Sequence, residues 1–464
     1  MSLTNALGSA RSGLGATSIQ ADTIARNISN ASTPGFTRKS AELVTIPNGG
    51  VYVSSIDRQV DTMLSRLDRG NVSRLAAERT LADGMKAYTS HLGQPEDAMS
   101  PVAGMARMKE ALITLSLGVS SRAGQMAVVS TGRELASNLN RLSDTLSSVQ
   151  SEVEMNIRYD VADLNKALYG IAALNKRIVA QPGNGMSMAD MKDEMDGLLQ
   201  KVSEIMDIQA VTDSSGMVSV MSTGGVELVM DTDVQEVTYD SSTGRLAAGN
   251  VTMTPGGNNR SFSAGSLHGL FTLRNDIIPT WSSDLDTMAA ALVEGFQREA
   301  PFADGRGLFT DGGQAYDPAA IDGLARRIRI NADADPDQGG DPSLVQSGGD
   351  PARASGDVSV VDAMIRLFES PVQVTGRPFG DSQGLTRMGA AIVSAHQQAR
   401  AQAERRAETT ATESATVRAS RENLQGVNVD DELQKLMLVQ QSYAANAKVL
   451  TTVSSMMDTL LQAV

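Results

Sequence analysis

The chain has 464 residues, of which 40 are Lys or Arg and 54 are Asp or Glu, so its formal net charge is −14. This length accommodates roughly two to four domains, and the acidic balance disfavours binding to nucleic acid or to an anionic membrane, because phosphate recognition needs a basic surface. The sequence has no cysteine, which excludes disulfide bonds, a thiol nucleophile and cysteine metal ligands.

The first thirty residues carry apolar side chains at alternating steps of four and three. This spacing is that of the a and d positions of a heptad, here called the seam, and it predicts a helix that packs on another helix. An ordinary amphipathic core helix fits the spacing equally well. The predicted interface positions of this helix are Leu3, Leu7, Ala10, Leu14, Ala21, Ile24 and Ile28.

The segment NISNASTPGF, residues 27–36, is expected to end this helix. Asn27 and Asn30 favour helix ends, and Pro34 displaces the preceding Thr33 from the α region. Pro34 and Gly35 suit the two central positions of a type II turn. The helix should therefore stop near Asn30.

The N-terminus also bears on where the protein resides. No basic residue precedes Arg11 and no unbroken apolar run follows, so the plan of a cleaved signal peptide is missing. No window of the chain approaches the ~20 consecutive apolar residues of a membrane-spanning helix. Taken alone, these features predict a soluble, cytoplasmic chain without membrane insertion.

Changes of hydrophobic period divide the interior. Extended sequence is expected at 37–57, and a helical period runs over 58–206 with breaks at 93–95 and 181–184. Strands and hairpins are expected at 207–275, where β-branched residues alternate around Ser-Ser-Gly and Gly-Gly turns. The remaining expectations are helix at 276–300, one strand (RRIRI) within the Gly-, Asp- and Pro-rich stretch 301–356, and helix at 357–424.

The last forty residues form a second helix with a seam. Asn428 is expected to cap it, with Asp430, Asp431 and Glu432 in the first turn, where the positive end of the helix dipole favours them. The predicted interface positions here are Leu433, Leu436, Tyr443, Ala447, Leu450, Met457 and Leu461.

Catalytic chemistry has little support in the sequence. His91, His268 and His396 stand alone, without metal-ligand spacing. The run Asp333, Asp335 and Asp337 imitates the start of a calcium loop but lacks its glycine and its closing glutamate. Nucleotide-binding and nucleophile-elbow motifs are missing as well. We therefore expect no catalytic, cofactor-binding or metal-binding residues, and a function that is not enzymatic.

Both ends of the chain resemble one protein family. ALGSARSGLGATSIQADTIARNISNASTPGFTRK is similar to the N-terminal signature of the flagellar rod, hook and hook-associated axial proteins. LQGVNVDDELQKLMLVQQSYAANAKVLTTVSSMMDTLL is similar to their C-terminal signature. The long helical region after the first strands, together with MADMKDEMDGLLQKVSEI and GSLHGLFTLRNDIIPTWSSDLDTMAAALVEGFQ, resembles the members that join hook to filament. The family's turn motif falls on Asn27, Asn30, Thr33, Pro34, Gly35 and Phe36.

The resemblance implies a fold that is mainly α with a β-rich insert. In this reading, 1–57 and 425–464 pair as a coiled-coil domain that lines an inner tube. A helical domain of 58–206, 276–300 and 357–424 would follow, built from both halves of the chain. The β-rich outer lobe would comprise 207–275 and 301–356, the latter a reduced form of the large insert found in many relatives.

The resemblance also implies a role and partners. The chain would be a structural subunit of the bacterial flagellum at the junction of hook and filament. It would be extracellular, and the flagellar type III system would export it without a cleaved signal peptide. Its expected partners are further copies in a helical ring, the hook protein, a second junction protein (hook-associated protein 3) and an export chaperone at the C-terminal helix.

Two alternatives remain from the sequence. One is a hook or rod protein of the same family. The other is a cytoplasmic coiled-coil scaffold with long Ala- and Gln-rich helices, which would have no need of the turn at 27–36.

Overall fold

The computed structural model describes residues 3–33, 35–46, 49–181, 183, 185–256, 260–369, 371 and 384–462. The chain divides into two compact units. Unit 1 comprises Met1–Ala77, Arg158–His268 and Glu408–Val464, and unit 2 comprises Glu78–Ile157 and Gly269–Ala407. Helices α2 (Thr62–Leu92), α4 (Arg122–Ala180) and α11 (Leu385–Gln425) contribute residues to both units.

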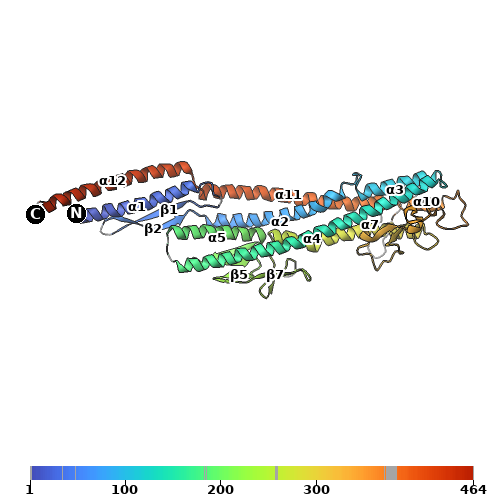
Figure 1. Cartoon of the computed structure of the whole chain (residues 1–464), viewed down its shortest axis with the longest axis horizontal. Coiled ribbons are helices and arrows are strands. Elements are labelled where there is room, and N and C mark those ends of the chain that lie inside the picture. The colour runs from blue at the N-terminus through green and yellow to red at the C-terminus, as the bar shows by residue number, and fades with distance from the viewer. Residues whose placement is uncertain are drawn as a thin grey trace. The chain divides into compact units, whose positions relative to one another are not determined.

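In unit 1, the two terminal helices lie side by side. They are α1 (Leu3–Ser29) and α12 (Val429–Gln462), and Figure 1 shows them adjacent, at the two ends of the colour scale. The antiparallel hairpin of β1 (Lys39–Thr45) and β2 (Val51–Arg58) packs against α1 and, through β2, against α5 (Met186–Ile205). The predicted helix end near Asn30 and the extended stretch 37–57 are both present.

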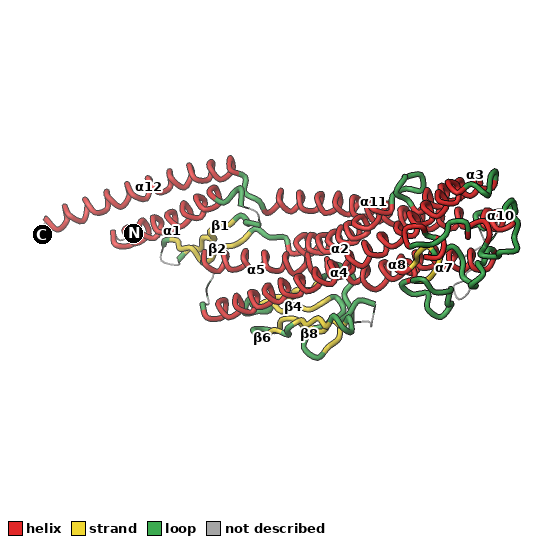
Figure 2. The backbone as a smooth tube through the Cα atoms, turned by 45° about the vertical axis from the view of Figure 1, so that its right-hand side comes forward, coloured by secondary structure: helices red, strands yellow, loops and turns green. Residues whose placement is uncertain are grey.

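The β-rich insert of unit 1 lies beside α4 (Figure 2). Two asparagines of α4 bond strand backbone through both ends of their amide groups. Asn165 donates to Val237 O and accepts from Val237 N, both at 2.8 Å. Asn175 does the same with Val218, at 2.9 and 3.0 Å. The insert contains two antiparallel sheets, with strand orders β3–β4–β5–β6 and β7–β8–β9. The strands β3 to β9 are, in order, Ile208–Thr212, Val218–Ser222, Glu227–Met230, Asp233–Val234, Val237–Asp240, Arg245–Ala248 and Val251–Thr252.

Unit 2 is built from helices around an aromatic core. The buried rings of Trp281 and His396 stack, and the buried Tyr88 ring lies tilted against both. Phe296 contacts Phe309 and Phe368 edge-on. A π-helical turn, Leu273–Ile277, joins α6 (Ser266–Thr272) to α7 (Ile278–Glu299). The other elements are α3 (Pro101–Ser116), β10 (Phe309–Asp311), α8 (Leu324–Arg327), β11 (Ile328–Ile330), the 3₁₀ turns Ala332–Ala334 and Pro336–Gln338, α9 (Leu344–Ser347) and α10 (Ser359–Arg366).

Some expected element types and boundaries were wrong. The segment 266–275 is helical and not extended, because Leu267, Leu270 and Phe271 have helical spacing and bury one face. In RRIRI only Ile328–Ile330 is a strand, and it pairs with β10. The segment 207–268 falls in unit 1 and the segment 301–356 in unit 2, and no described sheet contains strands of both.

Candidate assembly interface

The contact between α1 and α12 is close because α1 presents small residues to it. Ala10, Gly13 and Thr17 are buried. A Cβ atom added at Gly13 would lie 2.8 Å from Nδ2 of Asn446, so the two helices approach each other there as closely as a glycine permits. The Thr17 hydroxyl donates back to Gly13 O at 2.9 Å, so this buried hydroxyl is satisfied within α1.

The structure separates the predicted interface residues by burial. Ala10 and Ile24 are buried, whereas Leu433, Tyr443 and Leu461 are 45%, 49% and 76% exposed. Half-buried positions are Leu3, Leu7, Leu14, Ala21, Ile28, Leu436, Ala447, Leu450 and Met457. Other large apolar side chains of α12 that are exposed are Met437, Leu438, Val449, Met456 and Leu460. Within one chain, α1 therefore covers only part of the C-terminal seam.

Asn27 joins three segments of unit 1 through one buried amide. Its Nδ2 donates to Lys39 O and to Glu432 Oε2, both at 2.8 Å, and its Oδ1 accepts from Lys39 N at 3.1 Å. The end of α1, the first residue of β1 and the first turn of α12 are thereby fixed together. Sequence reasoning gave Asn27 a role in ending the helix, but the structure gives it this additional one.

The rest of the turn motif shapes the chain between α1 and β1. Asn30 Nδ2 donates to Arg26 O at 2.9 Å and closes the helix end. Phe36 N donates to Thr33 O at 3.2 Å, and Gly35 has φ +81°, the values expected for a type II turn. Pro34 lies outside the described residues. The ring of Phe36 lies under the Lys39 ammonium, 4.6 Å from its centroid.

Glu432 holds the start of α12 in place. Its carboxylate is buried and accepts from Asn27, from Arg38 Nε at 2.9 Å and from Lys435 Nζ at 3.0 Å. The predicted cap is present, since Asn428 Oδ1 accepts from Asp430 N at 3.0 Å. Glu432 was expected only to favour the helix dipole, but it supplies the main polar link to the N-terminal segment.

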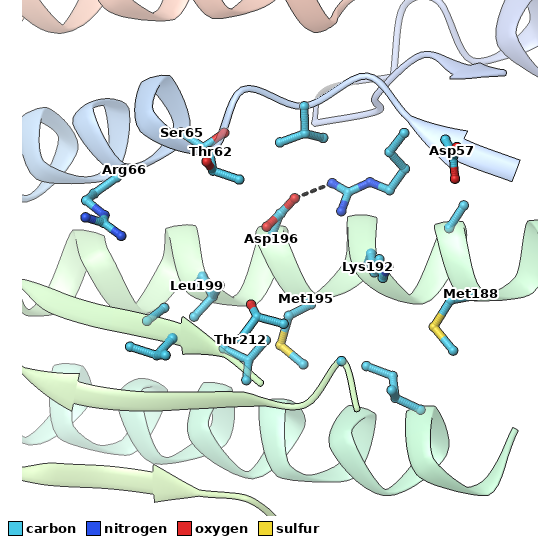
Figure 3. Close-up of a pocket in the computed structure, with 18 of the residues that line it drawn as sticks. Asp57, Thr62, Ser65, Arg66, Met188, Lys192, Met195, Asp196, Leu199 and Thr212 are labelled. Carbon is cyan, nitrogen blue, oxygen red and sulfur yellow. Dashed lines mark hydrogen bonds and ion pairs between the residues drawn. The ribbon is translucent and has the colours of Figure 1, made fainter. Parts of the chain in front are cut away.

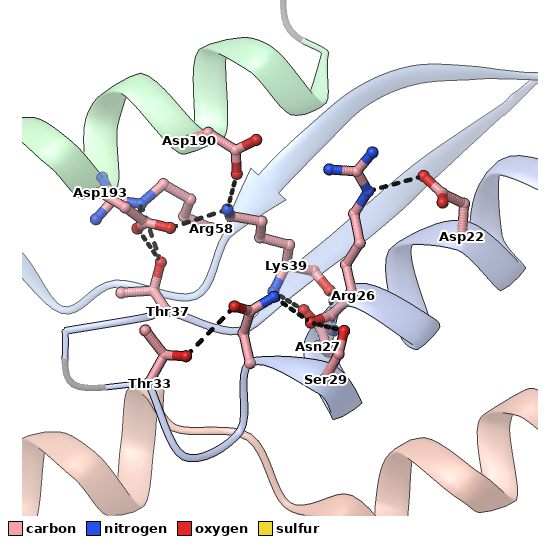
Figure 4. A network of polar contacts seen from close by, with 11 residues as sticks. Asp22, Arg26, Asn27, Ser29, Thr33, Thr37, Lys39, Arg58, Asp190 and Asp193 are labelled. Atoms are coloured by element: carbon pink, nitrogen blue, oxygen red, sulfur yellow. Dashed lines mark hydrogen bonds and ion pairs between the residues drawn. The ribbon is translucent and has the colours of Figure 1, made fainter.

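A second polar cluster ties the hairpin to α5 (Figure 4). Lys39 is almost fully buried and pairs with Asp190 and, at 2.9 Å, with Asp193. Arg58 pairs with Asp193 at 2.7 Å and with Asp196. The three aspartates recur every three residues along α5, so they share one face of the helix. The spacing of three between these aspartates in MADMKDEMDG indicates an acidic helix face, from which no contact was predicted.

Residues that resembled catalytic or metal-binding groups have structural partners. His396 Nε2 lies 3.0 Å from Asp284 Oδ2, and His91 Nδ1 lies 3.1 Å from Ala87 O. Asp335 and Asp337 pair with Arg133, and Asp333 pairs with Arg306 at 2.6 Å. Among the described residues, no group of three or more acidic or histidine side chains is placed to hold a metal ion.

Membrane insertion was also examined in the helices. Within the described ranges, no helix combines the length and the apolar character needed to cross a bilayer.

Comparison with known proteins matches both ends and the middle of the chain. Residues 91–299 match the model of the flagellar hook-associated protein FlgK helical domain. Residues 7–37 match that of the flagella basal body rod protein, and residues 422–463 match the flagellar basal body rod FlgEFG protein C-terminal model. The two terminal matches coincide with α1 and its turn motif, and with α12.

Individual relatives are similar to the chain over different shares of its length. Flagellar hook-associated protein 1 of Bacillus subtilis is 25% identical, over 98% of this chain and 97% of the relative. Its namesake in Salmonella typhimurium is 23% identical over 68% of this chain, which spans 59% of that relative's length. The hook junction protein FlgK from Burkholderia pseudomallei aligns with 53% of this chain at a TM-score of 0.46 and 18% identity. With matches to axial-protein models at both ends and to the FlgK helical domain between them, the chain is similar along its length to flagellar hook-associated protein 1.

Proposed function

We propose that this chain is a structural subunit of the bacterial flagellum that joins hook to filament and catalyses no reaction. The observation that carries this proposal is the joining of the two terminal segments at Asn27 and Glu432, together with the large apolar side chains that α12 leaves exposed. Exposed apolar side chains gathered on one element are a feature of protein association sites. Further copies of the same chain, arranged as a helical ring, are its proposed partners.

We assign the terminal segments 1–57 and 425–464 to the inner wall of the tube, with coiled-coil pairing of neighbouring terminal helices. The alternation of three and four residues in both seams supports this assignment. The helical segments 58–206, 276–300 and 357–424 would form the next shell. The outer lobe would comprise 207–265 and 301–356, since 266–275 is helical.

Localisation gives the direct test. The chain should be recovered with sheared extracellular hooks and filaments, and a strain lacking it should stop assembly at the completed hook. Recovery only in the cytoplasmic fraction would favour the scaffold alternative. Recovery along the whole hook or in the rod would favour the alternative of a hook or rod protein.

Export and partners form a further part of the proposal. We expect export by the flagellar type III system without cleavage, and contacts with the hook protein and with hook-associated protein 3. The exposed Leu433 and Tyr443 offer anchors at helical spacing for an export chaperone that binds a helix in a groove. Deletion of 425–464 should abolish capture of the chaperone, whereas deletion of 1–30 should preserve it. The opposite result would assign the chaperone to the N-terminal helix.

A further inference from the structure

Unit 1 contains a pocket of about 720 Å³ away from the contact between α1 and α12. It lies where the first turns of α2, helix α5 and strand β3 meet, and Figure 3 shows Ser65 and Arg66 approaching from α2 and Lys192, Met195 and Asp196 from α5. A volume of this size is typical of sites that bind ligands. The apolar part of the wall is Val60, Met188, Met195, Leu199 and Val211.

The pocket is lined by four cations and by two carboxylates, Asp57 and Asp196, so cations are in excess there although the chain has a net charge of −14. Arg58, one of its four cations, is neutralised by Asp193 and Asp196. The other three, Arg66, Arg69 and Lys192, form no ion pair in the described part of the chain. Burial lowers the pKa of the Arg69 guanidinium, against the opposing effect of Asp196, so this cation is desolvated without a direct counterion. The site is therefore suited to an occupant that is both acidic and apolar.

The corner between α11 and α12, residues 424–433, has this composition. Asp430 and Asp431 are exposed, and so are the apolar Leu424, Val429 and Leu433 beside them. The cap from Asn428 to the Asp430 and Asp431 amides fixes the backbone that carries both carboxylates. The corner therefore presents a preformed surface of two negative charges and flanking apolar groups.

We propose that the acidic corner of one copy docks into the basic pocket of a second copy. This inference rests on the proposed self-assembly and names one of its contacts. The pocket and the corner comprise different residues, and they adjoin in one chain, where Gln425 Nε2 donates to Ser65 Oγ at 3.2 Å. We propose a head-to-tail contact, in which every copy receives one neighbour and enters another. Such a contact propagates into a ring or a helix, as a tubular assembly requires.

A charge exchange between copies tests the contact. The pocket variant is Arg66→Glu with Lys192→Glu, and the corner variant is Asp430→Lys with Asp431→Lys; all four positions are exposed, and circular dichroism checks their folding. In sedimentation at low salt, the wild-type chain should self-associate and each variant alone should do so at least tenfold more weakly. An equimolar mixture should regain wild-type association, because each variant's pocket then complements the other variant's corner.

The control pair is Lys176→Glu with Asp163→Lys, exposed charges on α4 outside both surfaces, and it should associate like the wild type. Unchanged association of the pocket and corner variants, or a mixture that stays weak, would overturn this contact while leaving self-assembly intact. A wild-type chain that stays monomeric at every concentration would overturn both.

The absence of cysteine provides a second readout. Copies with Lys192→Cys, mixed with tagged copies carrying Asp431→Cys and oxidised, should give a cross-linked dimer that contains one copy of each. Copies with Lys176→Cys in place of Lys192→Cys should give none. Equal yields from the two mixtures would contradict the proposal.

Discussion

At the scale of single residues, unit 1 depends on a few buried polar groups. Asn27, Lys39 and Glu432 are all nearly inaccessible, and each bonds to a partner distant in sequence. Buried polar groups are stable only when they are paired, so the loss of one partner is costly. The effects of substitution should therefore depend more on these pairings than on apolar area.

Asn27→Ala should lower the free energy of unfolding by roughly 2–4 kcal/mol, since it removes three hydrogen bonds and leaves Glu432 with fewer donors. Urea denaturation measures the loss, and amide exchange should locate it at the start of α12. Asn30→Ala, which removes two exposed hydrogen bonds, serves as the control and should cost only about 0.5–1.5 kcal/mol. If the two variants lost equal free energy of unfolding, the buried hydrogen bonds of Asn27 would not be the reason for its effect.

Asp160 supplies a pH-dependent prediction. Burial raises the pKa of its carboxyl above the usual 3.8, and the hydrogen bond donated by the Ser266 hydroxyl opposes this effect. Because the pKa of Asp160 is higher in the folded than in the unfolded state, protonation of this group stabilises the fold. This stabilisation is complete when the pH is below the unfolded-state pKa, and it is lost as the pH rises through the folded-state pKa. Asp160→Asn should therefore equal or exceed the wild type in stability at pH 7, and this advantage should diminish on acidification towards pH 4. An advantage that grows on acidification would contradict this assignment.

At the scale of elements, close approach and charge periodicity decide which segments pair. Helix α1 offers α12 a glycine where a side chain would clash, and α5 offers the hairpin three aspartates on one face. Both features concern the contact between elements and not the stability of either element alone.

Gly13→Leu should separate α1 from α12 and cost about 1–3 kcal/mol, because the added atoms overlap the Asn446 side chain. Faster amide exchange along both helices is the expected measurement. Gly8→Leu and Gly15→Leu are matched controls in the same helix, since a Cβ atom at either position meets nothing within 4 Å. Controls as destabilised as Gly13→Leu would show that the close approach to Asn446 is not the cause, because leucine has a higher helix propensity than glycine and should not destabilise an exposed helical position.

Asp193→Ala should lower the free energy of unfolding by roughly 3–5 kcal/mol, because it breaks buried pairs with both Lys39 and Arg58. Chemical denaturation gives the value. Asp190→Ala is the comparison: this side chain is half exposed and Lys39 keeps Asp193, so the expected cost is at most about 1 kcal/mol. Equal costs would show that Asp193 is not the centre of the cluster.

Periodicity and capping chemistry predicted the elements well but not their contacts. The seams, the Asn428 cap and the helix end near Asn30 depend on residues that are close together in the sequence, so local spacing is enough to predict them. The link from Asn27 to Glu432 spans 405 positions, and local pattern contains no signal for it. The helix at 266–272 was missed because only seven residues separate a glycine turn from the π-helical turn, too few for the period to be distinct.

At the scale of the whole molecule, the exposed surface of α12 is the feature least explained by a single copy. Tyr443→Asp should change the free energy of unfolding by no more than about 0.5 kcal/mol, since the side chain is half exposed. It should nevertheless abolish incorporation into sheared hook–filament preparations, because assembly would bury the new charge. Ser442→Asp, exposed and outside the seam, should incorporate normally. Normal incorporation of Tyr443→Asp would contradict the proposed interface.

The π-helical turn at Leu273–Ile277 sets the direction in which the side chains of α7 point. A π turn contains one residue more than an α turn, so every position after Ile277 is offset by about 100° of helical phase from its place in an unbroken α-helix. Trp281 and Asp284 reach His396 in this shifted frame. Removing a single residue from the turn would restore regular helix and rotate both side chains away from His396. The chain therefore tolerates no change of length here without losing the orientation of α7.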